Sequence, residues 1–364
     1  MNASLSRVIA AMSLLVATVL TTSVLADPLP GRDLLKFSQE PMVATQIPHL
    51  DGTVHVYQGH DELSTAYGFP QGPPPTLPAF YQGRFMADDF ADNFNSPVVH
   101  VKWWGSYLDA QGPQNPQMPV DKFLIAFESD IPADPNDPFP YSRPGTPLLT
   151  QVVNRGALAA GSGTFTESLV RGPDPILGES LYEYNAELHL GKEFFQKADT
   201  VYWLKIVAMV DVPAGITFDP FNPPNNAAFP VTRWGWHNRD YTIQDTLASP
   251  NVSPGEFIEG FVEGTTPVWH FQDDSVQGDV RIHTQGLGTP LMPFIDQANM
   301  FPQKYIDGID GPGMGSIPGT QNIGSFSKDL AFKLYTIQVP EPGTCLMLLI
   351  GCIGVCGVGR RTRG

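Results

Sequence analysis

Pairs of neighbouring carboxylates are the residues of this chain whose types and spacing could do chemistry. They are Asp88 with Asp89, Glu128 with Asp130, and Asp273 with Asp274. Two carboxylates that face each other across a cleft can hydrolyse a glycosidic bond. Adjacent residues of one strand point to opposite faces, so Asp88 and Asp89 cannot form such a dyad within a strand. We therefore assign no catalytic residue, and keep a secreted carbohydrate hydrolase that uses loop carboxylates as the alternative function.

A second group of acidic residues could bind a cation. Asp307 and Asp310 lie in the glycine-rich stretch DGIDGPGMG, and SDIPADPND offers three more carboxylates. Hard oxygen ligands from loops suit calcium. Neither stretch has the spacing of an EF-hand loop, and an Asp-Gly turn needs no ion. The sequence favours turns at both places, with calcium at Asp307 and Asp310 as the other interpretation, and we expect no other cofactor.

The histidines and cysteines narrow the chemistry further. The eight histidines form no metal-binding motif, and those at His55, His100 and His270 lie in predicted strands, where a hydrogen-bonded structural role is the default. All three cysteines fall within the last 20 residues of the chain. Residues 27–342 therefore contain no cysteine nucleophile, no cysteine-ligated zinc and no disulfide, and their core alone must stabilise them.

The elements that must position these residues are predicted to be strands. Glycine and proline number 35 and 36 of 364 residues and leave no long uninterrupted helix. YEYNAEL alternates with period two, while TVYWLKIVAMV is apolar on both faces, as in a central strand. We predict an all-β fold, an antiparallel, jelly-roll-like β-sandwich with long Pro/Gly-rich loops. The six tryptophans lie in or beside predicted strands, and we expect most of them in the core.

The charge of the chain is strongly unbalanced. All 37 acidic residues but only 17 of the 21 basic residues lie between 27 and 342, so this body carries a formal charge of −20. A surface of this sign repels phosphate backbones, which excludes nucleic acid as an expected partner. It suits solubility, or a place in a charged extracellular matrix.

Both ends of the chain have the composition of export signals. Residues 1–26 contain one basic residue, Arg7, then an apolar run and the small residues expected before a cleavage site at Ala26. This pattern predicts a secretory signal peptide. Near the other end, residues 345–358 are 14 mostly apolar residues, which as a helix span about 21 Å against a bilayer core of about 30 Å. The segment is therefore a short transmembrane helix and a weak permanent anchor.

The last 26 residues also resemble a known signal. Val339, Pro340, Glu341 and Pro342 precede the apolar segment, and Arg360 and Arg361 follow it. This arrangement resembles the PEP-CTERM sorting signal of exosortase systems. The resemblance implies export across the inner membrane, transient retention by the tail, and processing by an exosortase near Pro-Glu-Pro. It also implies delivery to the cell surface or extracellular matrix of a Gram-negative-type bacterium.

The body of the chain resembles a second family. LLKFSQEP, MADDF, VKWWGSY, YSRPGTPLL, VYWLKIVA, WGWHNRD and DLAFKLYT occur in order across about 34–336. They resemble a domain of unknown function that recurs in exported planctomycete-type PEP-CTERM proteins. Glu128 stands where the resemblance leads us to expect a histidine. The resemblance implies architecture and address, and no catalytic residue is carried over.

Together these patterns predict four segments and a function. They are a signal peptide at 1–26, an extended segment at 27–84 packed on the main domain, a β-sandwich at 85–338 and the sorting signal at 339–364. We expect an exported, non-catalytic protein of the envelope or extracellular matrix, structural or adhesive, with polysaccharide as the ligand to test. A shallow face with exposed aromatic rings would favour binding, and two facing carboxylates in a cleft would favour the hydrolase.

Overall fold

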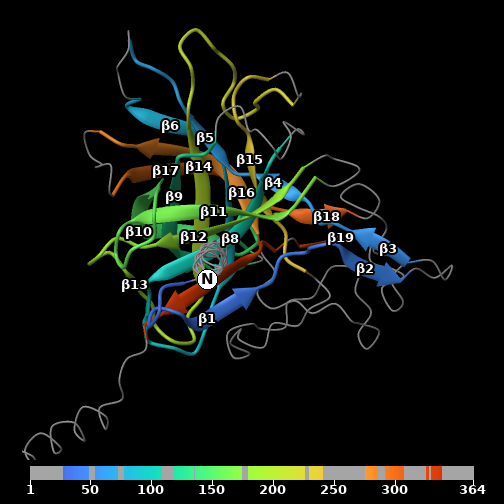
Figure 1. The fold of residues 1–364 in the computed structure, drawn as a ribbon, viewed down its shortest axis with the longest axis vertical. Helices are drawn as coiled ribbons and strands as arrows, with labels where there is room; N and C mark the ends of the chain where they lie inside the picture. Colours follow the sequence, from blue (N-terminus) through green and yellow to red (C-terminus); the bar gives the residue numbers. More distant parts are fainter. Residues whose placement is uncertain are drawn as a thin grey trace, which may run out of the picture.

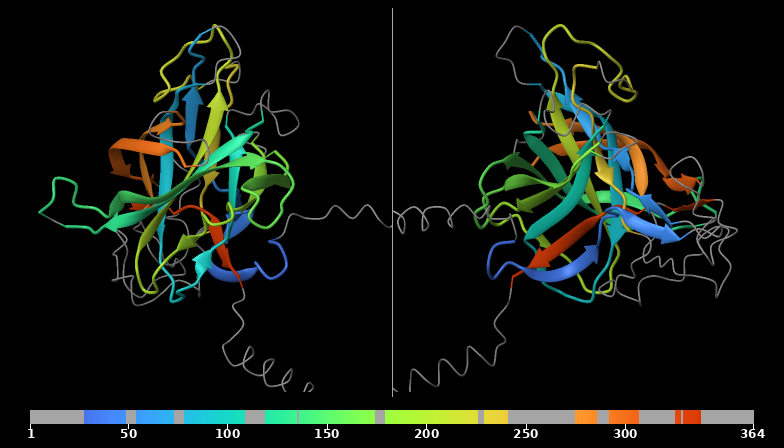
Figure 2. Two further views of the ribbon diagram at one scale, coloured as in Figure 1. Left: turned by 90° about the vertical axis from the view of Figure 1, so that its left-hand side faces the viewer. Right: turned by 45° about the vertical axis from the view of Figure 1, so that its right-hand side comes forward.

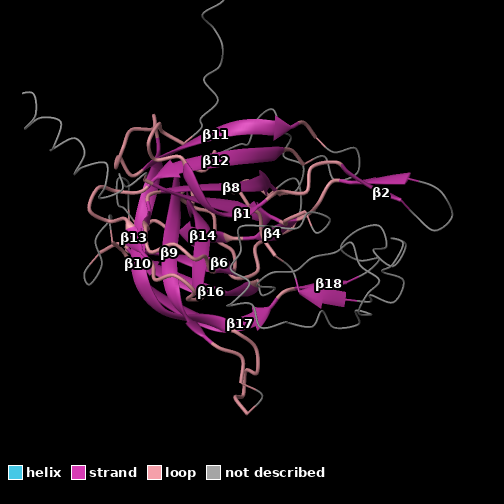
Figure 3. Ribbon diagram, turned by 90° about the horizontal axis from the view of Figure 1, so that it is seen from below, coloured by secondary structure: helices cyan, strands magenta, loops and turns pink. Residues whose placement is uncertain are grey.

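The computed structural model describes residues 28–48, 54–72, 78–108, 119–134, 136–173, 179–225, 229–240, 275–285, 292–306, 325–327 and 329–337. Within these ranges the chain forms twenty strands and no helix (Figures 1 and 3). The predicted all-β class is thereby confirmed. The signal peptide with Ala26, the sorting signal at 339–364, Asp273 and Asp274, and the calcium candidates Asp307 and Asp310 lie outside the described residues.

The strands are numbered in the order in which they occur along the chain. They are β1 Leu34–Gln39, β2 Thr45–Pro48, β3 Val54–Tyr57, β4 Asp61–Leu63, β5 Thr65–Gly68, β6 Phe80–Phe90, β7 Pro97–Val98, β8 His100–Tyr107, β9 Lys122–Ile131, β10 Arg143–Arg155, β11 Thr164–Arg171, β12 Leu181–Glu187, β13 Phe194–Phe195, β14 Tyr202–Asp211, β15 Trp234–His237, β16 Val276–His283, β17 Phe294–Pro302, β18 Lys304–Ile306, β19 Ser325–Ser327 and β20 Phe332–Thr336.

Fourteen of these strands form one sheet in the order β1-β20-β8-β12-β11-β10-β9-β14-β5-β6-β16-β17, with β15 and β4 beside this path. Most neighbours are antiparallel, as expected, but β10 pairs with β11 and β14 with β5 in parallel. The sheet is therefore mixed. The β10–β11 pair arises because residues 156–163 loop back beside the end of β10, helped by positive φ angles at Gly161 and Gly163.

Paired strands and one chain connection enclose the main core. Pairing runs from β8 through β12, β11, β10, β9 and β14 to β5. One residue separates β5 from β4, and β4 pairs with β15, which pairs with β8. Side chains from all of these strands except β4 and β5 meet in the largest cluster of buried apolar residues. Trp103, Tyr184, Phe123 and Trp234 pack there, with Trp103 and Tyr184 stacked at 5.3 Å between ring centroids.

A second layer covers the outside of this ring. Strands β6, β16 and β17 extend from β14 and lie over β9 and β10, enclosing a second apolar cluster. Strand β14 serves both layers, because Leu204 and Ile206 face the inner core while Trp203 and Val207 face the outer one. The sequence TVYWLKIVAMV predicts this two-sided burial.

Strand β6 joins the two layers through its own length. Side chains on one face of β6 lie in the main core, and those on its other face lie in the second cluster. The expected domain boundary between residues 84 and 85 falls within this strand. At the far end of the sheet, β1 pairs with β20. The loop between β9 and β10 reaches away from the body (Figure 2).

The aromatic residues of the described chain mostly fill these two layers. Trp103, Trp104, Trp203, Trp234 and Trp236 are at most 4% exposed, which confirms their predicted place in the core. None of these five can form a sugar-stacking platform on the surface. Trp269 lies outside the described residues.

No helix in the described ranges is long and apolar enough to cross a membrane.

Candidate ligand-binding groove

The outer face of β6, β16 and β17 carries alternating polar and aromatic side chains. Because side chains alternate along a strand, burying Val280 and Ile282 turns Asp279, Arg281 and His283 outward. The register places these three beside Arg84, Gln82 and Phe80 of β6, respectively. On the other side of β16, Arg281 is opposite Asp296 and His283 is opposite Phe294. Three strands thus present one continuous surface.

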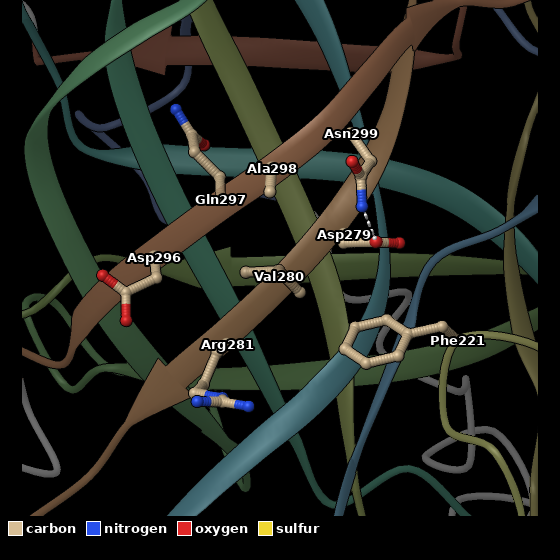
Figure 4. Close-up of a pocket in the computed structure, with 8 residues that line it drawn as sticks. All are labelled: Phe221, Asp279, Val280, Arg281, Asp296, Gln297, Ala298 and Asn299. Atoms are coloured by element: carbon tan, nitrogen blue, oxygen red, sulfur yellow. Dashed lines mark hydrogen bonds between the residues drawn. The ribbon is translucent and has the colours of Figure 1, made fainter.

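Part of this surface is hollowed into an open groove of about 330 Å³ (Figure 4). It is lined by Phe221, Asp279, Val280, Arg281, Asp296, Gln297, Ala298 and Asn299. This volume is at the lower end of the range of small-molecule sites. Seven of the eight residues come from the β16–β17 pair, and Phe221 comes from the loop after β14.

Arg84 holds the loop residue Phe221 against β6 and β16. Its Nε donates to the Phe221 carbonyl oxygen at 2.8 Å, and its Nη1 lies 2.7 Å from Oδ1 of Asp279. The Asp219 carboxylate accepts a hydrogen bond from the Phe221 N–H at 3.0 Å, which shapes the turn that presents the ring. Arg84 of β6 therefore links the loop that carries Phe221 to Asp279 of β16.

A β-bulge directs Asn299 toward the same acid. The register between β16 and β17 shifts between Gln277 and Asp279, and Asn299 has φ of 51°. Asparagine is among the few residues that adopt this left-handed conformation readily. From there its Nδ2 donates to Oδ2 of Asp279 at 2.6 Å. Both oxygens of Asp279 are held, so the carboxylate is fixed in place.

Beside the groove, next to Arg281 and Asp296, the same face combines charge with aromatic rings. His283 Nε2 lies 2.8 Å from Oδ2 of Asp296, and its ring lies between those of Phe80 and Phe294, at 6.3 and 5.7 Å. The Arg281 guanidinium lies over the Phe80 ring at 4.9 Å. Phe294 is half-exposed. The rings are tilted by about 50° rather than coplanar, so they form a stepped row along the surface.

A buried polar network holds the groove strands to the layer beneath. Gln297 leaves β17 on the side opposite Asp296 and donates to Glu128 and to the Gly145 carbonyl oxygen, both at 2.9 Å. Lys205 donates to both Gln297 and Glu128, and its ammonium lies 4.0 Å from the Phe85 ring centroid. Burial lowers the pKa of Lys205, while Glu128 raises it. Glu128 therefore acts as the counter-ion of a buried lysine.

The predicted carboxylate pairs have structural partners in the described residues. Asp88 is fully buried and accepts hydrogen bonds from the N–H groups of Leu330 and Asp89. Burial, and then the neighbouring Asp329, raise the pKa of Asp88 well above its usual value. Asp130 accepts from Trp203 Nε1 at 2.9 Å and from Ser142 Oγ at 2.8 Å. These acids stabilise the fold rather than line a cleft.

The acidic loop residues and the histidines also follow the simpler expectation. Asp134 and Asp137 accept the N–H groups of Asn136 and Phe139, two residues on, as turn-forming aspartates do. His100 is buried between Glu187 and Asn185, which confirms its structural role. Among the described residues no group of histidine, cysteine and acidic side chains could hold a metal ion.

The groove residues Asp279, Arg281, Asp296 and Asn299 are absent from the sequence-based candidates. The alternation of DVRIHTQ, residues 279–285, is typical of a strand and places Asp279, Arg281 and His283 on one face. That alternation is the signal that could have found them. The position of Phe221, about 60 residues earlier in the chain, has no counterpart in the local pattern.

Comparison with known proteins identifies the family but no relative of known activity. No curated protein and no solved structure matches the chain. The family model described as domain of unknown function (DUF7901) matches residues 35–261, which reach from β1 to β15 and end before the groove strands β16 and β17. The expected resemblance to a domain of unknown function is thus confirmed. Because this match covers more than half of the chain, the protein belongs to the DUF7901 family.

Proposed function

We propose that this protein is an exported, non-catalytic component of the cell envelope or extracellular matrix that contacts polysaccharide through the groove on β16 and β17. The groove carries the binding part of the proposal. Its fixed hydrogen-bonding groups, Asp279 and Asn299, lie on the same face as a half-exposed ring beside the groove, Phe294. Sugars present hydroxyl groups on their edges and C–H groups on their faces, and a site of this composition can bind both.

The location rests on the two ends of the chain. The signal peptide at 1–26 and the exosortase sorting signal, with Pro340, Glu341 and Pro342 followed by Arg360 and Arg361, are sequence patterns. They support an inner-membrane intermediate with exosortase as a transient partner. Delivery to the cell surface or matrix would follow. The formal charge of −20 on the body is compatible with such a matrix.

The binding part is tested with the full chain, purified in mild detergent, on an array of polysaccharides and oligosaccharides. Asn299→Gly is the informative variant, because glycine accepts φ of 51° while removing the amide that holds Asp279. We expect it to weaken binding several-fold. Phe294→Ala should weaken binding as well, whereas Phe139→Ala, which removes an exposed ring from the β9–β10 loop, should not. An array without any bound glycan would refute the proposed ligand class.

Two further arms of the same experiment address the alternatives. Binding is measured with calcium and with chelator, because Asp307 and Asp310 remain the candidate calcium ligands. Loss of binding with chelator would support them. The hydrolase alternative predicts new reducing ends when the protein is incubated with a glycan that it binds. Binding with no new reducing ends over many hours would support the non-catalytic proposal.

A further inference from the structure

Arg281 differs from the other cations of the groove face in having no carboxylate partner within the described part of the chain. Arg84 is paired with Asp279, and His283 lies against Asp296. Arg281 is exposed and makes one hydrogen bond, from Nη2 to the neutral Oε1 of Gln82 at 3.3 Å. The rest of its guanidinium lies over the Phe80 ring.

The register makes this arrangement notable. Arg281 is directly opposite Asp296 on β17, a position from which side chains of opposite charge commonly pair. Asp296 instead lies 2.8 Å from His283, and Arg281 turns toward β6. The acid that could neutralise Arg281 is therefore engaged elsewhere. Both Arg281 and Asp296 line the groove (Figure 4).

The acidic excess of residues 27–342 makes the unpaired state of Arg281 unusual. Between 27 and 342 there are 37 acidic and 17 basic residues, and most lysines and arginines of the described chain form an ion pair with a carboxylate. An arginine held on an aromatic ring keeps its planar donors oriented. Such a group binds a carboxylate through two parallel hydrogen bonds. The net charge of the body repels a polyanion as it repels a phosphate backbone, and the remaining acids of the groove repel an anion placed beside them. The favourable contact for an acidic group is therefore local, at Arg281.

We propose that the groove selects an acidic saccharide, a polymer containing uronic acid, and that Arg281 binds the sugar carboxylate. This inference rests on the proposed function and names the class of polysaccharide. Phe294, two strands across from Phe80, offers its half-exposed ring to a sugar face, while Asp279 and Asn299 in the groove meet neutral hydroxyl groups. Arg281 is thus the residue that determines specificity for the charged sugar.

The test compares oligomers of galacturonic acid with the same oligomers as methyl esters, using the full chain in mild detergent and titration calorimetry. Esterification removes the negative charge and keeps the ring and hydroxyl groups. We expect the acid form to bind roughly ten- to hundredfold more tightly than the ester. This difference should shrink as salt is added, because the Arg281 side chain is exposed.

Variants locate the effect. Arg281→Gln should weaken binding of the acid about tenfold or more and binding of the ester much less, while Arg281→Lys should recover part of the loss, since lysine keeps the charge but not the fork. Lys197→Gln removes the same charge from an exposed position near β13, outside the groove, and should leave both affinities unchanged. Circular dichroism checks that each variant is folded.

The outcomes separate this inference from the proposed function. Equal affinity for acid and ester, with binding that Asn299→Gly weakens, would overturn the role of Arg281 and leave a polysaccharide site in place. Preference for the acid that Arg281→Gln does not alter would also overturn it. Binding of no saccharide, charged or neutral, would refute the proposed function itself and this inference with it.

Discussion

The residue that most clearly couples the two layers is Glu128. It is fully buried between strands and faces Lys205 at 2.5 Å, with Gln297 of the groove strand bonded to both. Lys205 is itself fully buried. Removing the counter-ion of a buried cation strongly destabilises the folded state, because neither water nor another charge then compensates the cation. The stability of the groove strands thus depends on a charge pair that the solvent does not reach.

Replacing Glu128 with Gln should therefore lower the free energy of unfolding by about 3–5 kcal/mol. Urea denaturation measures the change. Asp211→Asn is the matched control, because it removes the partner of Lys122 at a half-exposed site and should cost at most about 1 kcal/mol. The double variant Glu128→Gln with Lys205→Met should recover much of the loss. A single variant as stable as the unchanged protein would contradict the role given to Glu128.

A second prediction at this scale concerns pH and Asp88. Burial and the neighbouring Asp329 raise the pKa of Asp88 in the folded protein above the value of about 3.9 in the unfolded chain. The folded state therefore binds more protons than the unfolded state above that pH. The stability that Asp88 contributes is complete below about pH 3.9 and declines as the pH rises through the folded pKa.

Asp88→Asn should remove this contribution to the pH dependence. Plotted against pH from 4 to 8, the free energy of unfolding of the unchanged protein minus that of the variant should fall as the pH rises. Urea titrations at a series of pH values supply both curves. A difference that stays constant over this range, or rises, would show that Asp88 does not hold its proton in the folded state.

Among the elements, β17 depends on side-chain hydrogen bonds that connect it to β10 and to the loop before β10. Thr150 of β10 donates its hydroxyl hydrogen to the Pro293 carbonyl oxygen at 2.6 Å, just before β17 begins. Tyr141 bonds to the Met300 carbonyl oxygen, and Gln297 reaches back to Gly145. In the described sheet, β16 is the one strand that pairs with β17. These side-chain bonds hold the strand over β10.

Thr150→Val keeps the shape of the side chain and removes the bond to Pro293. We expect a loss of about 1 kcal/mol in unfolding free energy. Hydrogen exchange should accelerate in β16 and β17 while β9 and β14 keep their protection. Thr146→Val makes the same substitution at an exposed position of β10 and should change neither quantity. Uniform acceleration across all strands would show that the bond is not local to β17.

The sequence predicts some elements well and others not at all. Alternation and two-sided apolarity identify the strands, and TVYWLKIVAMV predicts a strand with both faces buried because that property is local. The parallel pair β10–β11 depends on how a glycine-containing loop returns, and the groove depends on the register of β6, β16 and β17 and on Phe221 from another part of the chain. Such long-range geometry leaves little trace in a local pattern. Asp88 and Glu128 can be identified as acids in the sequence, but the groups that they contact, the Leu330 N–H and the Lys205 ammonium, lie far along the chain.

For the whole molecule, the sorting tail should determine where the protein is found. A chain that lacks residues 339–364 should appear in the periplasm or the medium instead of the membrane fraction, because no retaining segment remains. Cell fractionation and the mass of the recovered protein measure this. Thr362→Ala, inside the tail but outside the Pro-Glu-Pro and Arg-Arg groups, should behave like the unchanged chain. The same location and mass after deletion, in cells with intact sorting machinery, would contradict the sorting proposal.

The place of β20 in the sheet sets the order in which the molecule can be completed. β20 lies between β1 and β8, and it is the one strand that pairs with β1 in the described sheet. A chain made from its N-terminus therefore exposes β1 first and supplies its partner last, about 300 residues later. Until then the edge of β8 that β20 covers, around Trp103, stays open. Closing such a long loop is slow, and open edges invite pairing with other chains. The interval between the first and last strands is thus the period in which this protein most needs a chaperone.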